Sequence, residues 1–149
     1  MQLSSILSRS PLYSGASDRW FSEEGFIDRK LNLRVTPGDG YVSASIGRTG
    51  EKVFALSDYL VAIVSEARSF GLDRLLVHNR TGSPFEQKDF PFALSRTPSS
   101  VKFRRIAVVE PFDPHLDWTR LDIAFGRLFN VSVRRFSDAF DAVGWLSRD

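Results

Sequence analysis

The sequence contains no cysteine. This absence excludes a disulfide, a thiolate nucleophile, a zinc site built on sulfur and an iron–sulfur cluster. Long apolar runs are also missing: the longest, residues 59–64, has six residues, whereas a membrane-spanning helix needs roughly 18 to 20. Residues 1–17 lack the basic and apolar segments of a secretion signal. We therefore expect a cytoplasmic chain with no membrane span.

Clusters of like charge are missing as well. The net charge is +2 and no five consecutive residues carry charge of one sign, so the clustered basic surface of a nucleic-acid-binding protein is not indicated. With 42% hydrophobic and 26% charged residues, the composition is that of a globular protein. We expect an N-terminal arm at residues 1–29 and one domain at residues 30–149. The arm, around Trp20, leaves homodimerisation open, as does the edge of the sheet.

Alternating apolar and polar residues predict a β-hairpin at the start of this domain. Its strands are residues 31–35 and 41–46, and the turn between them is Thr-Pro-Gly-Asp-Gly. Apolar residues then recur at helical spacing up to Phe70. Ser57 is expected to cap this helix and Gly71 to end it.

Short apolar strands alternate with helices in the rest of the chain. The expected strands are residues 74–78, 106–109 and 131–136. The expected helices are residues 86–94, a helix that runs from a cap at Asp117 to residue 128, and a helix that runs from a cap at Ser137 to Leu146. Asn130 is expected to end the second of these helices. Because each strand is reached across a helix, these strands should be parallel. The predicted class is α/β, with a mixed, mostly parallel five-stranded sheet, flanking helices and the order β-β-α-β-α-β-α-β-α.

Three segments carry a resemblance to a known domain. They are Gly71-Leu-Asp-Arg-Leu-Leu-Val-His-Asn-Arg80, Arg105-Ile-Ala-Val-Val-Glu110 and Asn130-Val-Ser-Val-Arg-Arg-Phe-Ser-Asp-Ala-Phe-Asp-Ala-Val-Gly-Trp-Leu146. Together with the order of elements, they resemble the STAS domain, and more closely its bacterial branch named after the sporulation anti-anti-sigma factor, also called STAS/SEC14-like. The resemblance covers the chain from about residue 30 and implies the STAS fold more than a particular function. The function we expect from it is a non-enzymatic binding or regulatory module.

In regulatory STAS proteins, a serine that follows an aspartate at the start of a helix is phosphorylated by a partner kinase. The corresponding loop here has no Asp-Ser pair, so Thr81 and Ser83 are its only hydroxyl groups. We expect a binding site formed by Asn79, Arg80, Thr81 and Ser83, with His115 opposite, at the carboxyl ends of parallel strands. Arg80 would supply charge and the hydroxyls hydrogen bonds for a protein partner or a small anion.

Two other functions remain open from the sequence. Phe85, Phe90 and Phe92 lie in connecting segments, which is consistent with an apolar-ligand carrier of the SEC14-like kind, provided that a cavity of about 300 Å³ or more exists. A small enzyme would need His78 or His115 within hydrogen-bond reach of a carboxylate. These two histidines are 37 residues apart and show no ligand spacing, so we expect no metal and no cofactor.

Overall fold

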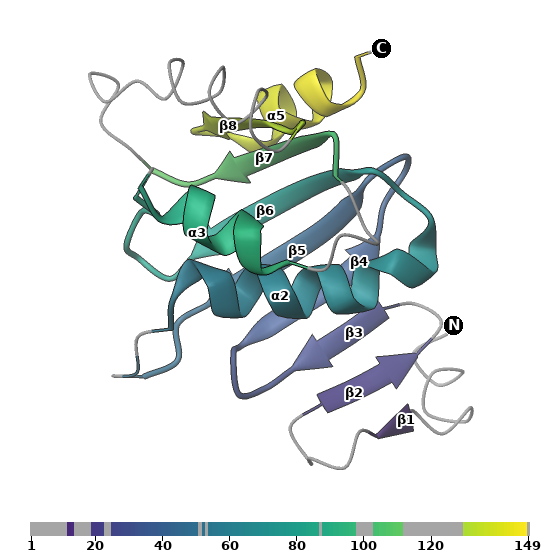
Figure 1. Ribbon diagram of the computed structural model, residues 1–149, viewed down its shortest axis with the longest axis vertical. Coiled ribbons are helices and arrows are strands. Elements are labelled where there is room, and N and C mark those ends of the chain that lie inside the picture. The colour runs from purple at the N-terminus through teal and green to yellow at the C-terminus, as the bar shows by residue number, and fades with distance from the viewer. Residues whose placement is uncertain are drawn as a thin grey trace.

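The structure, a computed structural model, describes residues 12–13, 19–22, 25–50, 52, 54–86, 88–97, 103–111 and 130–148. Its strands form one sheet in which each lies beside the next along the chain (Figure 1). They are β1 (Leu12–Tyr13), β2 (Arg19–Ser22), β3 (Gly25–Asp28), β4 (Leu33–Pro37), β5 (Val42–Gly47), β6 (Arg74–Arg80), β7 (Arg105–Val109) and β8 (Ser132–Phe136). The described helices are α2 (Leu56–Ala67), the 3-10 helix η1 (Arg68–Phe70), α3 (Asp89–Arg96) and α5 (Ala139–Leu146).

The sheet changes from antiparallel to parallel at β5. Strands β1 to β5 pair antiparallel, and β5 to β8 pair parallel. The α/β class is therefore confirmed, and each of the five expected strands is present. The expected count and the mostly parallel character are wrong, because β1, β2 and β3 add antiparallel pairs to the sheet. All three come from the segment expected to be an N-terminal arm.

Helices cover the two faces of the sheet unequally. Figure 1 shows α2 and α3 lying across one face. Alternate residues of the strands point to this face, and those of β5, Val42, Ala44 and Ile46, are fully buried there. On the opposite face, α5 packs against β6 and β7 in a smaller cluster that includes Leu76 and Trp145. The part of this second face over β4 and β5 carries polar side chains instead.

Two helix starts differ from the expectation. Helix α2 begins at Leu56, so Ser57 lies inside its first turn, and the carboxylate of Asp58 accepts a hydrogen bond from the backbone N–H of Ala55 (3.0 Å). A carboxylate at the third position of a helix accepts hydrogen bonds from backbone N–H groups that have no partner within the helix, as a capping side chain does. At α3, the helix begins at Asp89, which places Pro91 in the first turn, where a backbone N–H has no helical partner in any case.

The ends of the other described helices follow local chemistry. Gly71 ends η1 with a φ of 67°, as expected. Helix α5 is capped by Asp138, whose carboxylate accepts from the N–H of Asp141 (2.9 Å), and not by Ser137. Asn130 also has a left-handed backbone, with a φ of 57°, but the helix expected from Asp117 lies outside the described residues. Among the helices that the structure describes, none is long and apolar enough to span a membrane.

Candidate binding site

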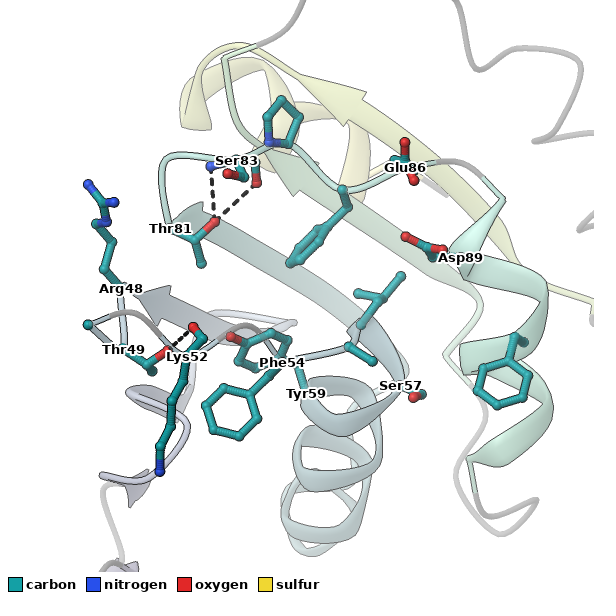
Figure 2. A pocket seen from close by; sticks show the side chains of 16 residues that line it. Arg48, Thr49, Lys52, Phe54, Ser57, Tyr59, Thr81, Ser83, Glu86 and Asp89 are labelled. Atoms are coloured by element: carbon teal, nitrogen blue, oxygen red, sulfur yellow. Dashed lines mark hydrogen bonds between the residues drawn. The ribbon is translucent and has the colours of Figure 1, made fainter.

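A pocket of about 950 Å³ opens at the carboxyl ends of β5 and β6. Ligands of α/β proteins bind outside this edge of the sheet, because loops from neighbouring parallel strands meet there. The loop after β5, the first turns of α2, the loop after β6 and the start of α3 form the walls (Figure 2). The pocket therefore combines segments that are far apart in the sequence.

The two ends of the pocket carry opposite charge. Arg48 and Lys52, from the loop after β5, lie at one end, and Glu86 and Asp89 at the other (Figure 2). The hydroxyl of Thr49 donates a hydrogen bond to the backbone oxygen of Lys52 (2.9 Å), which links these two residues of the loop. The sequence showed only a glycine-bearing connection here, so Arg48, Thr49 and Lys52 were missed as site residues.

Aromatic side chains line the pocket between its charged ends. The ring of Tyr59 lies 6.2 Å from that of Phe54 and 6.2 Å from that of Phe85, spacings at which aromatic rings attract one another. Phe85 in turn meets Phe90 at 6.5 Å, edge to face. Of the phenylalanines expected in a cavity, Phe85 and Phe92 line the pocket, whereas Phe90 is buried in the core.

The loop after β6 is held by the side chain of Asn79. Its Oδ1 accepts from the N–H of Thr81 (3.1 Å) and lies 2.7 Å from the Thr81 hydroxyl. Its Nδ2 donates to the backbone oxygen of Ser83 (2.8 Å), and the Ser83 N–H donates to the Thr81 hydroxyl (3.2 Å). Three of the expected site residues are thus brought together. Asn79 itself is buried, so it positions the loop and leaves Thr81 and Ser83 to line the pocket.

A buried carboxylate anchors this loop to the rest of the sheet. Oε1 of Glu110 accepts from Nδ2 of Asn79 (2.7 Å) and from the backbone N–H of Phe85 (3.1 Å). Its Oε2 lies 3.7 Å from Nη1 of Arg135, and both side chains are almost fully buried. Burial raises the pKa of the Glu110 carboxyl, and the hydrogen bonds and Arg135 offset this rise only in part. Glu110 was not a predicted site residue, although an acid that directly follows a buried strand is the signal that marks it.

Arg80 lies apart from the loop residues with which it was grouped. Successive residues of a strand point to opposite faces, so Asn79 faces the pocket side while His78 and Arg80 line a groove on the other face. Burial, and then the charge of Arg80, lower the pKa of His78. The position of His115 lies outside the described residues.

In the part of the chain that the structure describes, no three potential ligand side chains come together to hold a metal ion. Comparison of the chain with protein-family models, with curated proteins and with solved structures finds no match. The candidate site is therefore defined by its own geometry: a preformed pocket with a basic end, aromatic walls and an acidic end.

Proposed function

We propose that this protein is a non-enzymatic binding module of the STAS-like type, which takes its ligand in the pocket at the carboxyl ends of β5 and β6. The observation that carries the proposal is the fixed loop after β6. Because Asn79 and Glu110 already hold Thr81 and Ser83 in place, a ligand would not have to order this wall. A wall that is already ordered in this way supports binding.

The ligand that best fits the basic end is an anionic group, on a small molecule or on a protein partner. Arg48 is exposed at the mouth of the pocket, and Lys52 lies on the same loop. Arginine and lysine both recognise carboxylate and phosphate oxygens through charge-assisted hydrogen bonds. On this proposal, Glu86 and Asp89 at the opposite end favour ligands that also carry a donor or a positive charge.

An apolar-ligand carrier is the second candidate, and the aromatic walls favour it. The pocket volume of about 950 Å³ lies within the range of about 300 to 1,000 Å³ found for small-molecule sites. Phe54, Tyr59 and Phe85 supply adjoining ring surfaces. The two candidates differ in which part of the pocket provides the binding energy.

Native mass spectrometry of the protein, gently purified from its own host, tests both candidates. Ser83→Trp places a large side chain at the pocket wall, and Ser69→Trp is the matched control, since Ser69 is an exposed serine on η1, outside the pocket. We expect a stoichiometric anion or protein partner on the wild type and on Ser69→Trp, and its loss from Ser83→Trp. A species retained by Ser83→Trp, or a wild-type chain that carries none, counts against the proposal.

Charge variants separate the two candidates. Arg48→Gln combined with Lys52→Gln should lower the affinity for an anionic ligand about tenfold or more, because each charge-assisted hydrogen bond contributes on the order of 1.5 to 3 kcal/mol. An uncharged lipid or another uncharged apolar ligand should be retained by this double variant and lost from Phe54→Ala. The second pattern would replace the leading proposal with the carrier.

A further inference from the structure

The second face of the sheet holds a groove of its own. Helix α5 covers β6, β7 and β8 on this face. Next to it, over β4, β5 and the end of β6, lies a groove of about 440 Å³. The apolar side chains of β4 and β5 point away from it into the core, so most of its lining is made of the polar alternate residues, together with the exposed Ile27 of β3.

Strand register brings three of these polar residues into one row. Arg34 of β4 pairs with Ser45 of β5, and Ser45 pairs with His78 of β6. Neighbouring strands lie about 4.8 Å apart, so the three side chains project side by side from the same face of the sheet. Arg80, two residues beyond His78, pairs with Gly47, which has no side chain to cover it.

The groove is positively charged and rich in donors. Among the residues that the structure describes, its charged lining residues are Arg34 and Arg80, and no carboxylate lines it. Both arginines are exposed, and neither has an ion pair or a hydrogen bond with any residue that the structure describes. His78 is half-buried at the end of the row, two residues before Arg80 on β6, and Ser45 lies between it and Arg34. Two unpaired guanidinium groups on one concave surface are an arrangement suited to a multiply charged anion.

We propose that this groove is a second ligand site, distinct from the pocket and beyond the function proposed above, which binds the phosphate group of a small phosphomonoester. Such a group carries about −1.5 to −2 charges and three acceptor oxygens. Arg34 and Arg80 would each supply a guanidinium fork, and Ser45 and His78 would supply further hydrogen-bond donors beside them. A single carboxylate carries one negative charge against the two arginines, whereas a phosphate group comes closer to matching both, which is why phosphate fits better.

The titration of His78, followed by NMR, tests the proposal. The chain has two histidines, so His115→Gln leaves one imidazole to observe. Inorganic phosphate should raise the pKa of His78 in a saturable way, because a bound anion favours the charged imidazolium. Chloride at the same ionic strength should not. Glycerol phosphate should bind more tightly than inorganic phosphate, and weaker binding of the ester would overturn its assignment as the ligand.

Arginine variants locate the site. In the same His115→Gln background, Arg34→Gln and Arg80→Gln should each weaken phosphate binding about tenfold or more. Arg104→Gln is the matched control, because Arg104 is an exposed arginine that lines neither the groove nor the pocket. If Arg34→Gln does not fold, Arg80→Gln, at the end of its strand, carries the test. An equal effect of chloride, or equal weakening by Arg104→Gln, would show general charge screening and overturn the site.

Discussion

The side-chain amide of Asn79 donates a 2.7 Å hydrogen bond to Oε1 of Glu110. Asn79 lies in β6, and Glu110 directly follows β7. The bond therefore joins the ends of two neighbouring parallel strands at the edge where the pocket opens. Both groups are buried, and a buried polar group that loses its partner destabilises the folded protein. The pocket wall and the stability of the fold consequently depend on the same contact.

Replacing Asn79 tests this dependence. Asn79→Ala removes bonds to Thr81, Ser83 and Glu110, so we expect the free energy of unfolding to fall by about 1 to 3 kcal/mol. Asn79→Asp should be worse at neutral pH, because it sets a second carboxylate against Glu110, and it should recover when the solution is acidified. Urea denaturation at pH 5 and pH 7.5 measures both effects. An Asn79→Asp variant as stable as the wild type at pH 7.5 would contradict the contact.

The pH dependence of stability tests Glu110. Its pKa in the folded protein is raised above the ordinary value of 4.5, so the unfolded chain loses this proton first as the pH rises. The free energy of unfolding of the wild type, relative to Glu110→Gln, should therefore fall as the pH rises from about 4.5 through the raised pKa, and level off above it. Glu86→Gln is the matched control, because the side chain of Glu86 is 65% exposed. A relative stability that rises over this range would refute the direction.

The cap of α5 can be tested with two adjacent residues. Asp138→Ala removes the acceptor of the Asp141 N–H and should lower the free energy of unfolding by about 0.5 to 2 kcal/mol. Ser137→Ala should change it by less than about 0.5 kcal/mol, as expected for a surface position outside a cap. Thermal unfolding followed by circular dichroism measures the difference. The opposite ranking would restore Ser137 as the cap.

Arginines from the sheet hold the other end of α5. Nη1 of Arg105 donates to the backbone oxygens of Trp145 (2.8 Å) and Arg148 (2.7 Å), and Arg74 donates to those of Leu146 and Arg148. The positive charges of these arginines also interact favourably with the negative end of the α5 helix dipole. Arg105→Met should lower the free energy of unfolding by about 1 to 3 kcal/mol.

The matched control for Arg105 is its neighbour. Arg104→Met changes a side chain that is 64% exposed and pairs only at 3.8 Å with Asp73, and exposed ion pairs contribute about 0 to 1 kcal/mol. Equal losses for Arg105→Met and Arg104→Met in denaturant titrations would mean that the helix end does not depend on Arg105.

The sequence predicted strands where the apolar pattern was long enough to read. The hairpin of β4 and β5 and the strands β6, β7 and β8 were all found, because alternation or an unbroken apolar run marks them. Strands β2 and β3 have four residues each, too few to show a period. Gly25, which begins β3 with a φ of 148°, gives only a turn signal in the sequence.

The candidate site was predicted in part. Asn79, Thr81 and Ser83 were chosen because they follow a parallel strand, and the structure brings them together. Arg80 was grouped with them by proximity in the chain, although the period of two along a strand sends neighbouring side chains to opposite faces. The basic loop around Arg48 was missed, since its meeting with the loop after β6 depends on tertiary structure.

The order of the strands has a consequence for how the protein is made. Each described strand pairs with the one that precedes it in the chain, and no described strand inserts between two that are already paired. As synthesis proceeds from the N-terminus, β1 to β5 can therefore all pair with one another before β6 is complete, and each later strand adds to an existing edge. Chains whose contacts are close in sequence fold faster than those with distant pairings, and domains form in the order of synthesis. The sheet can thus grow strand by strand on the ribosome.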